Sequence, residues 1–478
     1  MSAKSPAQEP APAVPFARRI PLIVAAAFFM EMLDGTIVTT SLPAIAASFG
    51  ESALELTSII TVYLVAMGAF IPTAGWASAR FGARNLFAAA IAVFTLASLV
   101  CGAAPSFTVL LIARLVQGIA AAFMSPVGRL VVLRQTPKDQ IIRAIGLIVW
   151  PGLIAPVLGP ALGGFITTYT SWRWIFFINI PVGLVGVWLV LHFIPADAKE
   201  APTRLDKTGF VLTAIGLAAL VHGLALAGDP GSRVAVYATW IAVGLVFSVV
   251  AIRHALRHPT PMLDLRAVRA QTFQMSVVTA GMLSRTAISM TPFLIPLMFQ
   301  VGLGANAITG GVMLLVYMAG NLVMKSFTTP ILHRFRFYDV LWVNGALCVL
   351  ALVGCAMLGG STPLAITYAV LFVAGMTRSM HFTSTSTLAF ADVSDAHRAG
   401  ATTLWAMAQQ FGNVLGVAIA AFVAGISQTL RGGAPLSLAD FHWALYASAG
   451  MMAVAVLWLL KLPRDAGAEL ARKPSGTR

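Results

Sequence analysis

The chain has 478 residues, of which 58% are hydrophobic and only 10% are charged, whereas soluble domains carry about 25% charged residues. A chain this long and this apolar cannot bury its surface in a water-soluble core, so the composition indicates a membrane protein. The formal net charge of +14 does not indicate nucleic-acid binding. The basic residues lie in short connectors between apolar runs, and no zinc-ligand spacing or aromatic–basic pattern accompanies them.

The first 19 residues are rich in Ala and Pro and poor in large apolar side chains, which predicts a disordered tail. After the tail, apolar runs of roughly 20 residues, the length that a helix needs to cross a bilayer, follow one another to residue 461. The first run is too long for a signal peptide and is expected to remain as an anchor. We expect fourteen spans, at 20–45, 57–77, 86–104, 109–131, 141–168, 173–194, 208–227, 234–252, 272–299, 306–330, 339–359, 362–388, 399–427 and 441–461.

The basic residues also predict the orientation of the spans. If the first span starts in the cytoplasm and the chain then alternates, only Arg173, Arg233 and Arg431 of the 31 Lys and Arg residues lie in outer connectors. Five others are counted within spans, and the remainder, which include Arg143 and Lys461 at the ends of spans, are counted on the cytoplasmic side. Because cytoplasmic connectors are enriched in Lys and Arg, this distribution predicts that both termini are cytoplasmic.

Two patterns recur eight spans apart. The sequence MLDGT at 32–36 in the first span has a counterpart, MLSRT, at 282–286 in the ninth. Small residues also recur every four positions on one face of the fifth and thirteenth spans, which permits close helix packing. They are Ala155, Gly159 and Gly163 in the fifth span, and Ala408, Gly412, Gly416 and Ala420 in the thirteenth. The shared offset predicts a six-helix bundle at 20–194, a linker with two extra helices at 195–271, a second six-helix bundle at 272–462, and terminal tails at 1–19 and 463–478.

Several stretches match a known family. They are LDGTIV at 33–38 with Leu42 and Pro43 after it, GWASARFGAR at 75–84, RLVQG at 114–118, GPALGG at 159–164 and WRWIFFINIP at 172–181. From about residue 20 to 462, the chain resembles the major facilitator superfamily, in its fourteen-span drug:proton antiporter branch (EmrB/QacA type). PFLIPLM at 292–298 and Lys325-Ser326 are similar to the MdtD-like and HsrA-like subgroup of that branch.

The resemblance implies an all-α integral membrane protein with the major facilitator fold, in which two six-helix bundles flank two inserted helices. It implies a proton-coupled secondary transporter that exports small molecules across the bacterial cytoplasmic (inner) membrane as a monomer in the lipid bilayer. No cofactor or metal is expected. The sequence contains no P-loop, nucleophile elbow or metal-ligand cluster, so neither ATP-driven transport nor an enzyme is predicted.

The resemblance also assigns two structural motifs. The loop between the second and third spans forms a cytoplasmic gate in the family, and the fifth-span motif is typical of antiporters. One departure concerns the gate, because Ala79 stands where the family motif usually has an acid, so the usual latch is in doubt. The gate residues are Gly75, Arg80, Gly82 and Arg84, and the antiporter-motif residues are Gly159, Pro160, Gly163 and Gly164.

Apart from Asp339 at the first position of one span, only two acids, Glu31 and Asp34, lie within the expected spans, and their three-residue spacing places them on one side of the first span. A charge at mid-bilayer costs about 2.5–3.5 kcal/mol on insertion scales, so such acids rarely persist without a partner or a function. We predict that both acids take part in proton coupling, together with Arg114, whose counterpart in the family's fourth-span motif governs proton movement. The alternative is that Asp34 only neutralises the charge of Arg114.

Basic and polar residues in the spans indicate a substrate cavity. Arg285 and Arg378 lie near mid-span without a nearby acid, which predicts a water-filled cavity or an anionic substrate. Lys325, His381 and Gln117 are assigned to the same cavity, with snorkelling of Lys325 and hydrogen bonds between helices as the alternatives. The excess of buried cations keeps open an exporter of an organic anion or an acid–metal chelate. A more remote alternative is a membrane sensor or scaffold that transports nothing.

Overall fold

The computed structural model describes residues 18–51, 57–136, 140–196, 205–227, 232–259, 261–262, 265–394 and 398–467. The elements up to the second inserted helix are α1 (Arg19–Phe49), α2 (Thr57–Phe70), η1 (Ile71–Thr73), α3 (Ala74–Phe81), α4 (Ala83–Ala103), α5 (Phe107–Gln135), α6 (Ile141–Tyr169), α7 (Trp174–Phe177), α8 (Asn179–Phe193), α9 (Lys207–Ala227) and α10 (Val234–Arg257). The later elements are η3 (Leu265–Arg269), α11 (Gln271–Phe273), η4 (Gln274–Val278), α12 (Ala280–Leu297), η5 (Met298–Gly302), α13 (Ala307–Arg334), α14 (Phe337–Ala356), α15 (Leu364–Leu388), α16 (Arg398–Leu430) and α17 (Leu438–Leu459).

Thirteen helices in the described part of the chain are long and apolar enough to cross a membrane. The expected span at 362–388 is not among them, although its helix α15 has 25 residues. The run of Ser and Thr at 383–387, together with Arg378 and His381, makes this helix more polar than the others. Because α15 packs against α13 and α14, it still runs within the helical bundle. The all-helical membrane fold is therefore as predicted, and the one expected span outside the thirteen, the twelfth in the chain, is a more polar helix.

Three expected spans are interrupted helices. The span at 173–194 is divided at Ile178 into α7 and α8. The span at 57–77 consists of α2 and α3 separated by the 3₁₀ turn η1, which contains Pro72, a residue that cannot donate the backbone hydrogen bond of a continuous helix. The span at 272–299 has π-helical turns, η4 and η5, on either side of α12. Turns of this kind occur frequently at functional sites.

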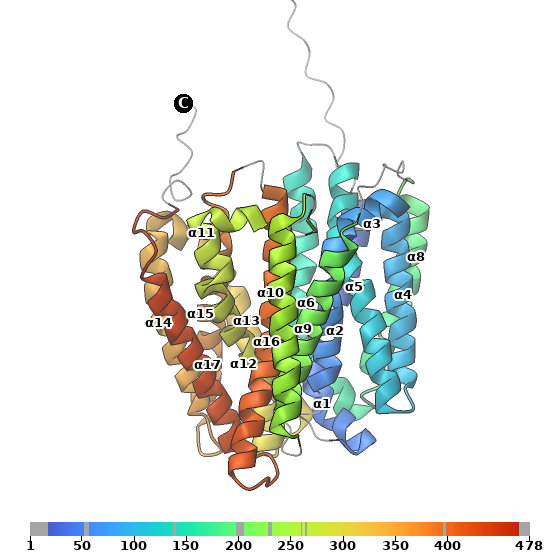
Figure 1. Cartoon of the computed structure of the whole chain (residues 1–478). Coiled ribbons are helices and arrows are strands. Elements are labelled where there is room, and N and C mark those ends of the chain that lie inside the picture. Colours follow the sequence, from blue (N-terminus) through green and yellow to red (C-terminus); the bar gives the residue numbers. More distant parts are fainter. Residues whose placement is uncertain are drawn as a thin grey trace, which may run out of the picture.

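The helices form two groups with a pair of helices beside them (Figure 1). In the first group, α1 packs against α5, α6 and α8, and α4 packs against α5 and α8. In the second group, α12 packs against α13, α16 and α17, and α14 packs against α15 and α17. The inserted helices α9 and α10 pair with each other, and α9 contacts both α2 and α16. The inserted pair therefore lies against a seam between the groups, and the predicted domain boundaries stay a prediction.

The two stripes of small residues occupy corresponding places. A Cβ atom at Gly163 in α6 would lie 2.5 Å from the carbonyl oxygen of Ile37 in α1. A Cβ atom at Gly416 in α16 would lie 2.8 Å from the carbonyl oxygen of Thr286 in α12. Each stripe thus allows close packing within its own group: α6 approaches the backbone of α1, and α16 approaches the backbone of α12.

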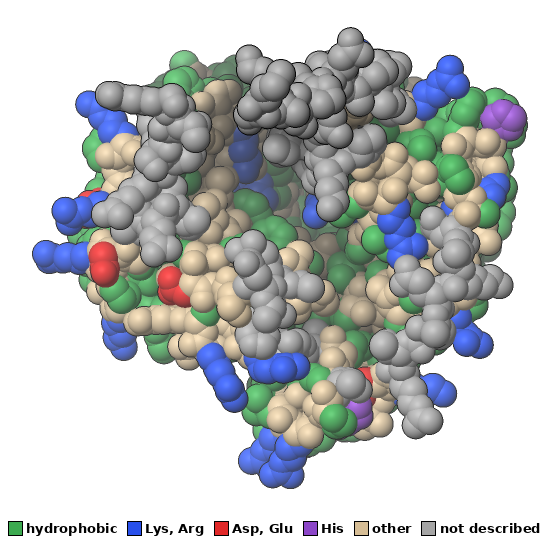
Figure 2. All heavy atoms as spheres, turned by 90° about the horizontal axis from the view of Figure 1, so that it is seen from above, with side chains coloured by type: hydrophobic (Ala, Val, Ile, Leu, Met, Phe, Trp, Pro, Cys, Tyr) green, Lys and Arg blue, Asp and Glu red, His purple; other side chains and the backbone are tan. Residues whose placement is uncertain are grey.

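The two groups are packed together at the end of the molecule where α1 ends. A single apolar cluster there contains Leu42 and Phe176 from the first group and Phe299 and Tyr317 from the second. In addition, the Gln300 side chain donates to a backbone carbonyl oxygen of α1 at 3.1 Å. At the opposite end, where α1 begins and α17 ends, the apolar clusters of the two groups are largely separate from each other. Seen from that end, the surface is hollowed near its middle, and Lys or Arg side chains lie inside the hollow (Figure 2).

Candidate functional site

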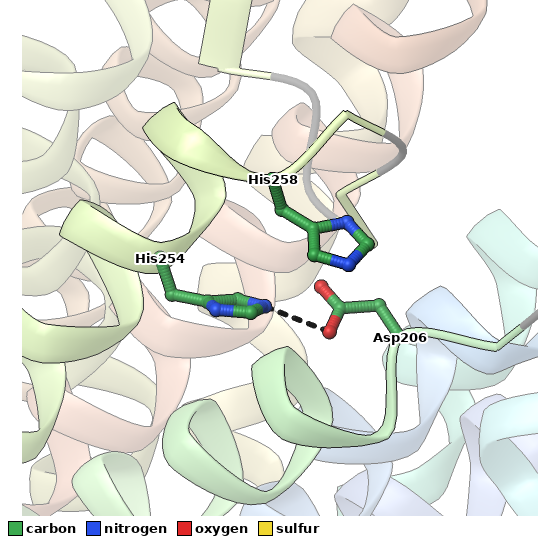
Figure 3. Close-up of side chains that lie close together, drawn as sticks. All are labelled: Asp206, His254 and His258. Atoms are coloured by element: carbon green, nitrogen blue, oxygen red, sulfur yellow. Dashed lines mark hydrogen bonds and ion pairs between the residues drawn. The ribbon is translucent and has the colours of Figure 1, made fainter.

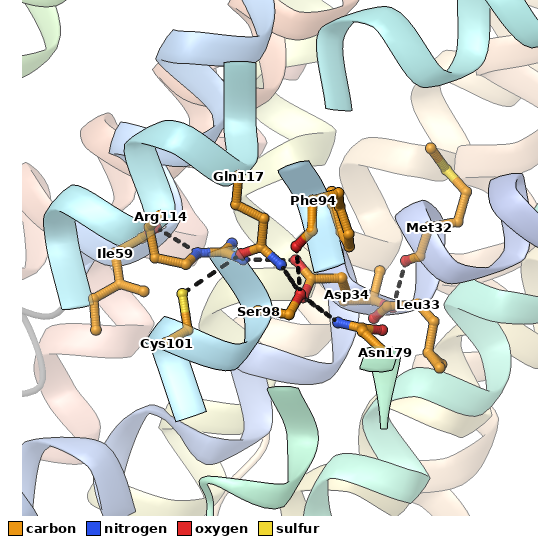
Figure 4. Close-up of polar contacts among 11 residues, drawn as sticks. Met32, Leu33, Asp34, Ile59, Phe94, Ser98, Cys101, Arg114, Gln117 and Asn179 are labelled. Atoms are coloured by element: carbon orange, nitrogen blue, oxygen red, sulfur yellow. Dashed lines mark hydrogen bonds and ion pairs between the residues drawn. The ribbon is translucent and has the colours of Figure 1, made fainter. Parts of the chain in front are cut away.

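Asp34 and Arg114 form a buried ion pair between α1 and α5 (Figure 4). The Arg114 Nη1 atom lies 2.6 Å from Asp34 Oδ2, and the exposed fractions of the two side chains are 1% and 0%. Both residues were predicted from the sequence, and the structure brings them together. A charged hydrogen bond in such a dry place is strong, but each partner depends on the other to offset its desolvation.

Two amide side chains complete the environment of Asp34. Gln117 Nε2 and Asn179 Nδ2 each donate to Asp34 Oδ1 at 3.0 Å, and both also donate to the hydroxyl of Ser98, at 2.7 and 3.2 Å. Gln117 accepts from Arg114 through Oε1 at 2.7 Å. We call these five residues the Asp34 network. It joins α1, α4, α5 and α8, so it ties together four helices of the first group.

The sequence assigned Gln117 to a substrate cavity and did not single out Ser98 or Asn179. The structure places Gln117 in the Asp34 network with no exposed surface. Asn179 lies within the 172–181 stretch that matches the family. A systematic search for polar residues within apolar spans would have identified all three, because such residues need partners in the membrane.

The remaining contacts of Arg114 are also within the first group. Its Nε atom donates to the carbonyl oxygen of Ile59 at 3.3 Å, and its guanidinium lies over the Tyr63 ring at 4.2 Å from the ring centroid. The Phe176 ring is at 5.9 Å on a further side. Aromatic faces attract a cation and exclude water at the same time. The guanidinium is therefore held by one carboxylate, two neutral acceptors and two rings.

Glu31 lies one helical turn from Asp34 and is also buried, with an exposed fraction of 1%. It also contacts α5, but at Ser125 instead of Arg114. The Ser125 hydroxyl donates to Glu31 Oε2 at 2.7 Å. The other oxygen, Oε1, has no hydrogen-bond partner among the described residues. The two acids of α1 therefore share a side of the helix, as predicted, but their environments differ.

The second group contains a different kind of site around Arg285. Arg285 in α12 is 3% exposed, and neither of its terminal nitrogen atoms has a hydrogen-bond partner in the described part of the chain. Its aliphatic part packs against Gly412 of α16. His381 in α15 is 1% exposed and lies within electrostatic range of Arg285, and neither ring nitrogen has a hydrogen-bond partner among the described residues. The site thus has buried polar groups without partners, which are costly unless something binds them.

Arg378 and Lys325 lie in the same group but are half-buried. Arg378 has its guanidinium 5.6 Å from the centroid of the Tyr317 ring, and its Nη1 atom lies 3.6 Å from the sulfur of Met318. Lys325 donates to the hydroxyl of Thr383 at 2.8 Å. These contacts link α13 to α15, and none of them involves an acid. The structure thus places four of the five predicted cavity residues in the second group.

The predicted gate loop connects α3 to α4. Gly82 has φ of 82°, a backbone conformation that favours glycine, and it ends α3 and precedes α4. Arg84 reaches across to α8, where its Nη2 atom donates to the carbonyl oxygen of Leu191. Arg80 is exposed, and Gly75 has open space where a Cβ atom would lie. Arg84 therefore connects helices of the first group in this arrangement.

The predicted antiporter motif lies where α6 meets both groups. A Cβ atom at Gly159 would lie 2.3 Å from the Thr36 hydroxyl oxygen in α1. One at Gly164 would lie 2.4 Å from the carbonyl oxygen of Ala307 in α13, on the opposite group. The carbonyl oxygen of Pro160 in turn lies against Gly311 of α13. The motif therefore lets α6 approach α1 on one side, where the Thr36 side chain lies against Gly159, and the backbone of α13 on the other.

Comparison with known proteins agrees with this architecture. The sequence profile of the Major Facilitator Superfamily matches residues 24–417. The chain belongs to the Major Facilitator Superfamily. It is 38% identical over 407 residues to a protein of Pectobacterium carotovorum, covering 84% of this chain and 86% of the relative. It is 35% identical over 450 residues to a protein of Escherichia coli, covering 93% and 94%. Both relatives carry the name MdtD and are described provisionally as multidrug resistance proteins.

Solved structures of superfamily members share the fold at low sequence identity. The peptide transporter PepTSo superposes with a TM-score of 0.68 at 13% identity, covering 94% of this chain and 98% of that one. A D-xylose–proton symporter gives 0.65 at 15% identity, with the same coverage. A bacterial homologue of the lysosomal transporter Spinster, in an inward-facing form, gives 0.66 at 16% identity, covering 96% and 99%. This superfamily member is therefore a multi-pass membrane transporter of small molecules and not an enzyme.

Proposed function

We propose that the chain exports small molecules in exchange for protons by alternating access, and that protonation of Asp34 couples the two movements. The observation that carries this proposal is the Asp34 network. Both carboxylate oxygens of Asp34 accept hydrogen bonds from groups that can only donate, namely a guanidinium and two amide NH₂ groups. This environment stabilises the charged carboxylate. When α1 shifts relative to α5, Asp34 loses its cation in an apolar interior and takes up a proton.

Glu31 supports the same proposal because its environment favours the opposite protonation state. A charged carboxylate would require several donors, yet Glu31 has the Ser125 hydroxyl on one oxygen and no partner on the other. The environment therefore fits the neutral, protonated acid. We infer that in this arrangement Glu31 holds a proton while Asp34 does not, so the two acids are at different stages of one transfer.

We infer the orientation in the membrane from the basic connectors, and the type of membrane from the bacterial relatives. We place both termini in the cytoplasm and the protein, as a monomer, in the bacterial inner membrane. The hollow end of the molecule then faces the cytoplasm and the packed end faces outward, as expected of an exporter that is ready to load. The names of the MdtD relatives support a drug-like cargo. With Ala79 in place of the usual acid, we infer that the contact between Arg84 and α8 holds the gate loop in this state.

The proposal is tested with the full-length protein in liposomes that contain a pH-sensitive dye. We expect the Asp34→Asn variant to insert normally but to lose substrate-driven proton movement, because an amide cannot carry the proton. Transport of a cationic dye and of an aromatic carboxylate is followed in parallel. The matched control is Asp339→Asn, which changes an exposed acid outside the network. Normal exchange with normal proton release by Asp34→Asn would show that Asp34 is not the carrier.

A second candidate cargo, an organic anion or an acid–metal chelate, is favoured by the unpartnered Arg285. Its two terminal nitrogen atoms are buried without an acceptor in the part of the chain that the structure describes, and a carboxylate of the cargo would supply one to each. We expect Arg285→Gln and Arg378→Gln to weaken transport of an aromatic carboxylate and to leave that of a cationic dye largely unchanged. Arg334→Gln, at an exposed position, is the control. Loss of dye transport alone would count against this cargo.

A further inference from the structure

Three potential metal ligands meet outside the transport site, beside the inserted pair of helices. Asp206 directly precedes α9, His254 lies in the last turn of α10, and His258 directly follows α10. One carboxylate oxygen and one nitrogen from each imidazole lie within 4.8 Å of one another. Figure 3 shows the Asp206 carboxylate between the two rings, each ring facing a different oxygen. The sequence alone does not reveal this group, since Asp206 and His254 are 48 residues apart.

The backbone holds the three side chains in place. His258 donates its backbone N–H to the carbonyl oxygen of His254 at 2.9 Å, which continues the helical turn and keeps the two rings on one face. Asp206 accepts from the backbone N–H of Gly209 at 2.8 Å and from that of Met262 at 3.2 Å. The carboxylate is therefore oriented by the start of α9 and by the chain after α10. Hydrogen bonds of this kind orient metal ligands in known sites.

The donor set selects the class of ion. Imidazole nitrogen suits Zn²⁺ and the neighbouring transition metals, whereas Mg²⁺ and Ca²⁺ prefer oxygen ligands throughout. Ligand atoms about 2.0–2.2 Å from a tetrahedral Zn²⁺ are about 3.3 Å apart. His254 Nε2 and Asp206 Oδ1 are 2.8 Å apart, so small rotations of the side chains bring all three atoms to that spacing. The side chains of His254 and Asp206 are 22% and 3% exposed, which leaves a path for the ion and for water as a fourth ligand.

We propose that Asp206, His254 and His258 bind a divalent transition-metal ion, Zn²⁺ by its chemistry, which fastens the start of α9 to the end of α10. To bind, His254 presents the lone pair of the nitrogen facing Asp206 and carries its proton on the other nitrogen. Since α9 contacts α2 and α16 across the seam between the groups, the ion stabilises the inserted pair in this position. The proposal does not depend on the cargo or on the role of Asp34.

The experiment uses the full-length protein, purified with an affinity tag that contains no histidine and stripped of metal with a chelator. Co²⁺ is added first because its visible absorption reports imidazole coordination, and Zn²⁺ is then added to displace it. We expect one Co²⁺ per chain, displacement by one equivalent of Zn²⁺, and a higher thermal unfolding temperature with Zn²⁺. His258→Gln should weaken Zn²⁺ binding at least about a hundredfold, since even residues that only orient ligands cost up to that factor.

Two further variants make the result decisive. Asp206→Asn keeps a side-chain oxygen that can accept from Gly209, so the start of α9 remains capped while the charged ligand is lost. It should bind Zn²⁺ as weakly as His258→Gln. His333→Gln removes an exposed histidine from the end of α13 and should bind normally. Absence of stoichiometric Co²⁺ absorption, or unchanged binding in both His258→Gln and Asp206→Asn, would overturn the proposal. The group would then be only a set of hydrogen-bonded side chains that joins α9 to α10.

Discussion

Arg114 and Arg285 are both buried arginines in membrane helices, with exposed fractions of 1% and 3%, yet their environments are opposite. Arg114 is paired with Asp34 and lies against aromatic rings, whereas the terminal nitrogen atoms of Arg285 have no partner in the described residues. A buried cation without a partner is unfavourable, so it persists where a ligand or a function requires it. The first group therefore has a polar site complete in itself, and we propose that a cargo completes the site of the second group.

This contrast predicts opposite effects on stability from the same substitution. Arg114→Gln should destabilise the protein by about 3–5 kcal/mol, because it leaves the Asp34 carboxylate buried without its cation. Arg285→Gln should change stability little or increase it, because it removes a desolvated charge and breaks no hydrogen bond of the terminal nitrogens. Thermal unfolding of the purified variants, followed by tryptophan fluorescence, measures both effects.

A double variant separates the ion pair from packing. Asp34→Asn combined with Arg114→Gln should recover part of the stability that Arg114→Gln loses, since neither charge then remains uncompensated. If Arg285→Gln is instead as destabilising as Arg114→Gln, Arg285 has a structural partner and the contrast between the groups fails.

Substitutions in the glycine stripes test the same contrast between the two groups, with a smaller expected effect on stability. Gly163→Ala would bring a Cβ atom to 2.5 Å from a backbone oxygen of α1, which cannot move without the helix, so we expect a loss of about 1–3 kcal/mol. Gly412→Ala would meet the Cγ atom of Arg285 at 2.9 Å, a side-chain atom that a change of rotamer can move. Its cost should be below about 1 kcal/mol, because alanine also favours the helix. Equal losses in the two variants, measured by thermal unfolding, would show that Arg285 is as fixed as the backbone of α1.

Most of the fold was accessible from the sequence, because apolar runs and basic connectors are direct consequences of the bilayer. The site was only partly accessible. The two acids and Arg114 stand out as charges within spans, but their partners Ser98 and Asn179 are ordinary polar residues whose meeting depends on helix rotation. The breaks at η1, η4 and η5 were not predicted, since proline and π-helical turns leave the hydropathy of a span nearly unchanged. The polar helix α15 shows the converse, because its Arg, His, Ser and Thr residues lower its hydropathy while packing against α13 and α14 keeps it in the bundle.

The smallest expected effect concerns Glu31, the second acid of α1. If Glu31 is neutral in this arrangement, Glu31→Gln exchanges one neutral group for another of similar size and keeps an oxygen to accept from Ser125. Its effect on stability should then be below about 1 kcal/mol, the net value of a typical hydrogen bond. Ser125→Ala decides between the two protonation states. It should cost about 1 kcal/mol if Glu31 is neutral, but about 1.5–3 kcal/mol if Glu31 is charged, because a charged acceptor would lose its hydroxyl donor. A loss in the higher range, measured by thermal unfolding, would mean that both acids of α1 are deprotonated in this arrangement and that the proton must be taken up at another stage of the cycle.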